Sequence, residues 1–110
     1  AILDKYPIDK GHSLVITKKP YEKLTDMSSQ EVAELFSKIP KIANAIIKAT
    51  NADAFSIAQN NGKAAKQIIP HVHVHIIPRY SATGTLWLKR KILKDDELDE
   101  LAQKIRNCIE

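Results

Sequence analysis

Hydrophobic and polar residues alternate along two stretches of this chain, as they do on β-strands that bury one face. In residues 12–17 the alternation sets Leu14 and Ile16 on one side, and in residues 71–77 it sets three histidines against apolar residues. Shorter apolar stretches, residues 1–3 and 54–59, also predict strands. A loop over residues 60–67 joins the last two strands, which most simply pair antiparallel. That pairing places Asn60 and Gln67 near the same end of the sheet as the histidines.

A helical pattern lies between the second and third of these strands. Ser28 and Glu31 have the spacing of a capping box, which predicts the start of a helix. From Val32 to Ile47, apolar residues recur every three or four positions and form one stripe for the core. Pro40 interrupts the stripe at a cost of about 3 kcal/mol in an undistorted helix, so a kink or two abutting helices are expected there. Asn51 is the predicted C-cap.

A second helix is predicted near the C-terminus, with Asp95 or Asp96 as its N-cap. Its apolar side consists of Leu98, Leu101, Ile105 and Ile109. Before it, a loop leads into Leu86-Trp87-Leu88 and the basic cluster Lys89-Arg90-Lys91. The predicted fold class is α+β, in which an antiparallel β-sheet carries the kinked helix on one face and the second helix follows. The 110 residues make one domain, residues 1–110.

Composition narrows the classes of function. Apolar residues make up 44% of the chain and charged residues 27%, which is ordinary for a soluble globular protein. Apolar runs are too short to span a membrane, and we expect a cytoplasmic protein. The net charge of +4 favours anionic partners, but few aromatic residues accompany the basic clusters. Nucleotides or other small phosphates are therefore expected as ligands in place of nucleic acid. The single cysteine, Cys108, is expected to pack and not to react.

The three histidines of the last strand are candidates for chemistry. Their imidazoles project from one face at intervals of roughly 6.5–7 Å, close enough to surround one small anion or one metal ion. A neutral imidazole is a competent nucleophile and a charged one is a proton donor, so His73 flanked by His71 and His75 suits phosphoryl or nucleotidyl transfer. The same row is also compatible with a zinc site, although three ligands from one strand strain a tetrahedral ion. The residues alone leave both readings open.

The stretch His71-Val72-His73-Val74-His75-Ile76-Ile77 resembles the signature of the histidine-triad family, in which three histidines alternate with apolar residues. Gly11–Ile16 resembles the family's earlier strand, and Asn60-Asn61-Gly62 followed by Gln67 resembles its phosphate loop. Asp4 precedes His12 by eight residues, as the family's ribose-binding aspartate does. The resemblance implies an enzyme that acts at the α-phosphate of a nucleotide through a covalent nucleotidyl-histidine.

The resemblance also implies a role for each histidine. His73 would be the nucleophile, and the backbone carbonyl of His71 would accept its other ring proton. His75 would bind the α-phosphate oxygens and assist the leaving group. His12 would pair with His71 behind the row.

Further residues would bind the nucleotide. Asn60, Gln67 and the backbone amide of Ile68 would surround the phosphate. Asp4 would hold the ribose hydroxyls, and Ile2 and Leu3 would form part of the base pocket. Two departures from the family pattern concern the phosphate loop. Lys66 stands where many relatives have glycine, and Ile68 stands where some relatives have a hydroxyl residue.

The favoured function is a purine-nucleotide phosphoramidase or dinucleoside polyphosphate hydrolase, with an AMP-containing substrate and a homodimeric assembly. No cofactor and no metal are expected. The family's opening hairpin, which carries a zinc-binding cysteine pair in many prokaryotic members, is expected to be absent before Ala1. Two alternatives are a nucleotide-binding regulatory protein with negligible turnover and a zinc-dependent hydrolase.

Overall fold

A computed structural model describes residues 1–81 and 94–109 of the chain. Its strands and helices are β1 (Ile2–Leu3), β2 (Ser13–Ile16), α1 (Ser29–Ser37), α2 (Ile39–Thr50), β3 (Ala54–Ala58), β4 (His73–Arg79) and α3 (Asp95–Cys108), with two short 3-10 helices, η1 (Leu24–Asp26) and η2 (Lys63–Ala65). The predictions for Leu86-Trp87-Leu88 and for the basic cluster at 89–91 lie outside the described residues. The predicted α+β class is confirmed.

The strands form one antiparallel sheet in the order β1-β2-β4-β3. The expected antiparallel pairing of the last two strands is confirmed. Val74 and Ile76 of β4 are fully buried and belong to the core, together with Val15 of β2. Their burial fixes which face of β4 is turned inward, because alternate side chains of a strand point to opposite faces. The histidines of β4 are thereby turned to the other face.

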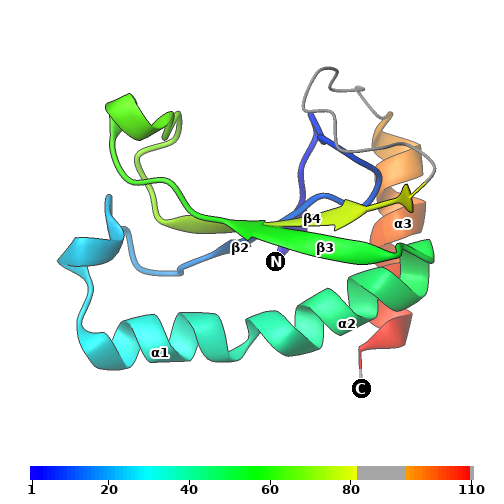
Figure 1. Ribbon diagram of the computed structural model, residues 1–110, viewed down its shortest axis with the longest axis horizontal. Helices are drawn as coiled ribbons and strands as arrows, with labels where there is room; N and C mark the ends of the chain where they lie inside the picture. The colour runs from blue at the N-terminus through cyan, green and yellow to red at the C-terminus, as the bar shows by residue number, and fades with distance from the viewer. Residues whose placement is uncertain (82–93, 110) are drawn as a thin grey trace.

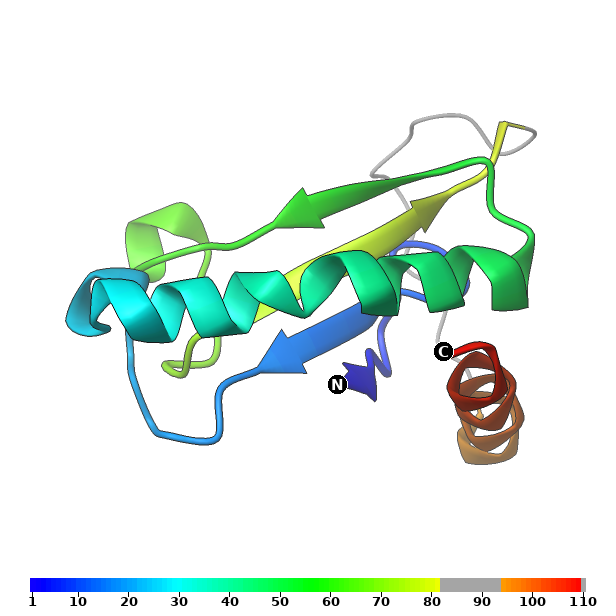
Figure 2. The same cartoon turned by 90° about the horizontal axis from the view of Figure 1, so that it is seen from below.

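Helices α1 and α2 cover the inner face of the sheet and follow one another across it (Figure 2). The predicted capping box opens α1, with the Glu31 amide donating to Ser28 Oγ at 3.2 Å and the Ser28 amide donating to the Glu31 carboxylate at 2.9 Å. The run breaks at Lys38, and Pro40 lies in the first turn of α2, where its missing amide costs least. Asn51 ends α2 in a left-handed conformation, with φ 56°. The predicted break and C-cap are both confirmed.

Helix α3 packs against α2 through buried Leu101 and Ile105. Its N-cap is Lys94, so the prediction of Asp95 or Asp96 is wrong. The aspartates instead occupy the first turn, where a negative charge is favourable next to the helix N-terminus. Within the part of the chain that the structure describes, no helix is long and apolar enough to cross a membrane.

Two loops rise from the outer face of the sheet, the face opposite α1 and α2 (Figure 1). One is the segment that connects β1 to β2, and the other contains η2 and connects β3 to β4. The histidines of β4 lie on the same outer face. The fold therefore sets a row of imidazoles between two loops while the opposite face of the sheet forms the core.

Candidate active site

The outer face of the sheet carries a row of aligned side chains from three strands. In the register of β2 and β4, Leu14 lies opposite His75 and Ile16 lies opposite His73. In the register of β1 and β2, Ile2 lies opposite Leu14. Both imidazoles are half-buried, and their ring centroids are 5.0 Å apart. Two histidines therefore stand beside an apolar strip of Ile2, Leu14 and Ile16.

The tautomer of the neutral His73 ring is set by a backbone contact. Its Nδ1 lies 2.7 Å from the carbonyl oxygen of His71, the contact that the family resemblance implied. A carbonyl oxygen only accepts, so Nδ1 carries the proton and donates it. In the neutral ring, Nε2 therefore keeps its lone pair and is able to act as a nucleophile.

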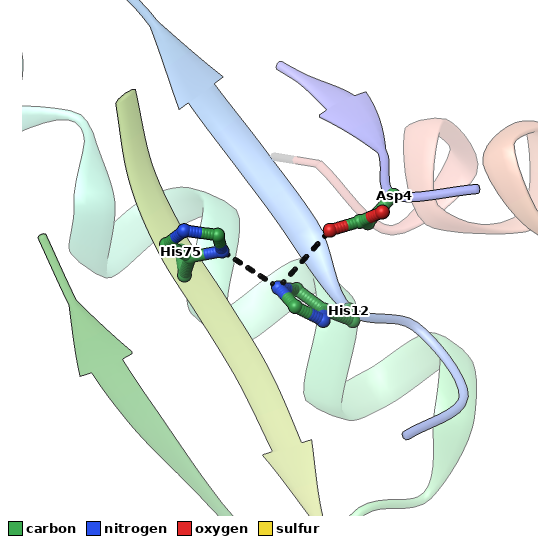
Figure 3. Close-up of side chains that lie close together, drawn as sticks. All are labelled: Asp4, His12 and His75. Carbon is green, nitrogen blue, oxygen red and sulfur yellow. Dashed lines mark hydrogen bonds and ion pairs between the residues drawn. The ribbon is translucent and has the colours of Figure 1, made fainter. Parts of the chain in front are cut away.

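The fourth histidine pairs with a different member of the row from the one expected. Nε2 of His12 lies 2.9 Å from Nδ1 of His75 (Figure 3), so the prediction that His12 pairs with His71 is wrong. The reason is the strand register. Because Leu14 lies opposite His75, His12 lies beyond it toward the C-terminal end of β4, whereas His71 lies before the N-terminal end of that strand.

His71 precedes β4, so the prediction that all three histidines lie on the strand is wrong, and its ring is held by the end of β2. Its Nε2 donates to the carbonyl oxygen of Thr17 at 2.7 Å and lies 3.0 Å from Thr17 Oγ1. The Thr17 hydroxyl itself donates to the carbonyl of Lys19. The ring of His71 thus anchors its own peptide, and with it the carbonyl that orients His73.

Asp4 and Ile2 lie on the histidine face, and Leu3 does not. The amide of Asp4 donates to the carbonyl of His12 at 2.8 Å, and its carboxylate accepts from the Tyr6 amide at 2.8 Å. The other carboxylate oxygen lies 3.6 Å from Nε2 of His12 (Figure 3). Ile2 is 56% exposed. Leu3 pairs with Ser13 and packs against the core, so the structure does not bring it to the imidazoles.

The predicted phosphate-loop residues occupy three different positions. Asn60 follows β3 by two residues, at the end of β4 that carries His73. Gln67 is buried, and its amide accepts from the Gly62 amide at 2.6 Å and donates to the carbonyl of Glu22 at 2.6 Å. The side-chain amide of Gln67 thus bridges Gly62 in its own loop and Glu22 in a second segment of the chain. Ile68 exposes 88% of its surface.

Among the described residues, Asp4, His12 and His75 each offer a possible metal ligand, and these ligand atoms all lie within 4.8 Å of one another. An imidazole that binds metal through Nε2 needs a proton on Nδ1, which it normally donates to an acceptor. Nδ1 of His12 instead accepts from the backbone amide of Ile8 at 3.0 Å. Metal binding would therefore break that hydrogen bond or require an imidazolate. These three side chains are therefore better arranged to share a hydrogen bond than to bind a metal ion.

Residues 1–82 match the sequence pattern of the HIT domain. The chain belongs to the HIT, or histidine-triad, family. Its sequence is 42% identical to an adenylylsulfatase from Arabidopsis thaliana over 109 residues, which cover 98% of this chain and 55% of the plant protein. It is 33% identical over 112 residues to an adenosine 5′-monophosphoramidase from Schizosaccharomyces pombe, covering 99% of this chain and 80% of the yeast protein. The chain thus spans little more than half of the plant protein.

The fold is also similar to solved structures of the HIT family. A hypothetical histidine triad nucleotide-binding protein from Sulfolobus tokodaii superimposes with a TM-score of 0.87 at 34% identity, over 97% of this chain and 74% of that one. At this identity, the likeness extends to the family and is not limited to the fold.

Sequence reasoning missed several residues of this HIT site. Leu14 and Ile16 alternate with Val15 on β2, so their place on the same face as His12 was available from the pattern. Ile8 and Thr17 act through backbone groups on imidazoles distant in sequence. No pattern of residue types announces such contacts, because every residue except proline carries the same amide and carbonyl.

Proposed function

We propose that this HIT protein hydrolyses AMP-containing purine nucleotides at the α-phosphate through a covalent nucleotidyl-histidine at Nε2 of His73. The observation that carries the proposal is the 2.7 Å contact between His73 Nδ1 and the His71 carbonyl. This contact favours one tautomer and one ring orientation, and leaves the lone pair of Nε2 available for attack. A preoriented lone pair is what nucleophilic catalysis by histidine requires.

The reaction proceeds in two balanced steps. Nε2 of His73 forms a bond to the α-phosphorus, and the bond to the leaving group breaks with its electron pair on the leaving group. The substituted ring is cationic because Nδ1 keeps its proton, and the carbonyl of His71 stabilises that charge. Water then replaces the ring on phosphorus, one water proton is released with the nucleoside monophosphate or to solvent, and the imidazole regains its lone pair.

The residues around His73 support a bound nucleotide. The carboxylate of Asp4 has an oxygen at the edge of the site and is oriented by the Tyr6 amide, which suits ribose hydroxyls. Ile2, Leu14 and Ile16 form an apolar strip of a kind that suits a flat purine. Asn60 and the loop held by Gln67 lie at the other end, where the phosphates would extend. His75 stands next to His73 and is placed to bind the α-phosphate.

The adenosine 5′-phosphate part of the substrate is better supported than the leaving group. Relatives named for adenylylsulfate and for adenosine monophosphoramidate share that part and differ in what is attached to it. A dinucleoside polyphosphate shares it as well. The proposal therefore covers all three substrate types at this stage.

The test compares wild type with His73→Ala and His71→Ala on adenosine 5′-phosphosulfate, adenosine 5′-phosphoramidate and diadenosine tetraphosphate, with and without a chelator. His73→Ala removes the nucleophile and should lower kcat/KM by at least about 10³-fold. His71→Ala is the comparison variant: it keeps the backbone carbonyl that accepts from His73 but removes the ring that anchors this carbonyl to Thr17, so it should lower kcat/KM by less than His73→Ala does.

A rapid alkaline quench followed by mass spectrometry should find an AMP-sized adduct on His73. Turnover that the chelator abolishes would support a zinc-dependent hydrolase instead. Nucleotide binding without turnover of any of the three substrates would support a regulatory binding protein. An adduct on another residue would refute the role given to His73.

We also propose a homodimer, as the family resemblance implies. Phe55 and Ile57 of the edge strand β3 expose 41% and 46% of their surface. Apolar side chains on an unpaired strand edge commonly mark a surface that associates. Light scattering after size-exclusion chromatography should give the mass of two chains, and a monomer at micromolar concentration would contradict the proposal.

A further inference from the structure

Two short segments that are far apart in the sequence are joined at the end of the sheet where β4 begins with His73. One contains the 3-10 helix η1, and the other is the loop from β3 to β4 (Figure 2). The Leu24 amide donates to Oδ1 of Asn61 at 2.8 Å, and the Gln67 side chain donates to the carbonyl of Glu22 at 2.6 Å. The start of the loop and its end are thus attached separately to the same neighbouring segment.

The contact with Leu24 determines how the side-chain amide of Asn61 is turned. A backbone N–H only donates, so the atom of Asn61 that faces it is the oxygen, and Nδ2 points elsewhere. Nδ2 donates to Oε1 of Gln59 at 2.6 Å, and Nε2 of Gln59 donates back to Oδ1 of Asn61 at 2.9 Å. Gln59 and Asn61, here called the amide pair, therefore hold each other by two hydrogen bonds, and the Leu24 amide anchors them.

Asn60 lies between the two members of the amide pair. In the register of β3 and β4, Ala58 lies opposite His75, so a continuation by two residues brings Asn60 level with His73. Strand β3 ends at Ala58, and its pairing does not fix the direction of the residues that follow. Successive side chains of extended backbone point to opposite sides. Joining the amide pair on one side therefore leaves Asn60 on the other, which is the side of Ala58 and the histidines.

The side-chain amide of Asn60 forms no hydrogen bond within residues 1–81 and 94–109, although those of both its neighbours do. We propose that Gln59 and Asn61 are positioning residues: the amide pair, anchored to the Leu24 amide, holds Asn60 on the histidine face, where its NH2 group donates to a phosphate of the bound nucleotide. The inference rests on the proposed function and adds to it the residues that orient a phosphate ligand.

The size of the effect follows from the kind of hydrogen bond that is positioned. A hydrogen bond from an amide to a charged phosphate oxygen contributes about tenfold to a hundredfold to kcat/KM. The amide pair acts only through Asn60, so its loss cannot cost more than the loss of Asn60 itself. Asn61 is exposed, and water competes for its hydrogen bonds. We therefore expect the amide pair to contribute about threefold to tenfold.

The first experiment is a double-mutant cycle of Asn60→Ala and Asn61→Ala, read as kcat/KM on whichever of the three adenosine substrates wild type cleaves fastest. Each single variant should lower kcat/KM. The double variant should be no slower than Asn60→Ala alone, because the amide pair then has no side chain left to position. Effects that multiply in the double variant would show that Asn61 acts independently of Asn60, and would overturn the inference.

Two further variants control this cycle. Asn107→Ala is the matched control, since Asn107 accepts from the side-chain amide of Gln103 at 2.9 Å but lies on α3, and it should leave kcat/KM unchanged. Gln59→Ala breaks the amide pair and keeps the contact between Leu24 and Asn61. It should repeat the coupling with Asn60→Ala, and it replaces Asn61→Ala in the cycle if that variant does not fold.

The second experiment tests the anchor by comparing Leu24→Pro with Leu24→Ala. Both variants shorten a side chain that packs against the core, but only Leu24→Pro removes the amide that donates to Asn61. Lys23 has ψ 154°, an extended conformation that suits the residue before proline, and the first residue of a helix tolerates proline. Leu24→Pro should have the lower kcat/KM, and the difference should vanish in an Asn60→Ala background. Equal kcat/KM in the two variants would overturn the role of the anchor.

A binding measurement separates this inference from the proposed function. If wild type cleaves none of the three substrates, the proposed function fails, and the cycle of Asn60→Ala and Asn61→Ala is read from the Kd of AMP by isothermal titration calorimetry. Coupled effects of the two substitutions on Kd would support the positioning role without any turnover. Independent effects, or no binding of AMP by wild type, would overturn it.

Discussion

Gly11, the residue before His12, offers a test of how tightly the loop beside the active site is built. Its φ is 92°, and a Cβ added there would lie 2.8 Å from Cγ2 of Thr50 and 3.1 Å from Cγ of Pro78. Gly62 provides a matched control in the other loop. Its φ is 91°, but an added Cβ would meet nothing closer than Cε of Lys23 at 3.8 Å.

The magnitudes follow from these two environments. Both alanine variants would hold a non-glycine residue in a sparsely populated backbone region, at a cost of about 1–3 kcal/mol. Gly11→Ala would also overpack the core, which typically costs about 1–3 kcal/mol more. Relief is difficult because Pro78 is fully buried and the Thr50 hydroxyl donates to the carbonyl of Ile46 at 2.8 Å. We expect a loss of about 2–6 kcal/mol for Gly11→Ala.

Urea unfolding followed by far-ultraviolet circular dichroism measures the free energy of unfolding of wild type and both variants. Gly11→Ala should be the less stable variant by about 1–3 kcal/mol, because close contacts add to the backbone cost at Gly11 and not at Gly62. Equal destabilisation would show that the neighbours of Gly11 yield without cost, and would refute the reasoning from close packing. Active-site geometry should suffer in the same variant, because Gly11 directly precedes His12.

Three further changes test other contacts. The Tyr21 hydroxyl, which donates to Glu31, and the Ser28 amide lower the pKa of Glu31 from 4.5 to about 2. The ionised Glu31 carboxylate therefore stabilises the folded protein fully above pH 4.5, and this stabilisation is lost as the pH falls through about 2. Thermal unfolding should show Glu31→Gln less stable than wild type at neutral pH, with a Tm difference that disappears at about pH 2; a constant difference would contradict this. Lys66 has φ 68°, a left-handed conformation that is unfavourable for any residue with a Cβ, so Lys66→Gly should raise the free energy of unfolding by about 1 kcal/mol. A lower free energy of unfolding in urea would contradict this strain. Gln67→Ala breaks both loop hydrogen bonds and should cost about 1–3 kcal/mol and raise KM for nucleotide, whereas an unchanged KM would separate the loop from binding.

The elements themselves were predictable because they depend on neighbours in the sequence. Ser28 and Glu31 are three residues apart and cap each other within one turn, so α1 begins where the sequence indicates. Pro40 affects only its own and the preceding turn, which places the break between α1 and α2. The N-cap of α3 was misplaced because several polar residues adjoin there, and sequence alone does not rank them.

The position of the candidate active site also depends on residues that are close in the sequence. Alternation on β4 turns His73 and His75 away from the core, and the contact from His73 Nδ1 to the carbonyl of His71 spans only two residues. The family signature was therefore enough to predict both the row of histidines and the central position of His73. Gln67 was a different case. The sequence indicated that it belongs to the phosphate loop, but it did not predict the two contacts that turn its amide inward.

The sequence by itself thus determined the elements, the face of the sheet that carries the histidines and the identity of the nucleophile candidate, since each depends on periodicity or on residues close in the chain. Tertiary structure alone decided that His12 meets His75, that Leu3 joins the core, and that the amide of Ile8 donates to His12. These depend on the register between strands and on the path of a loop. Register and loop path arise from the packing of the whole domain, and a backbone amide carries no signature of residue type.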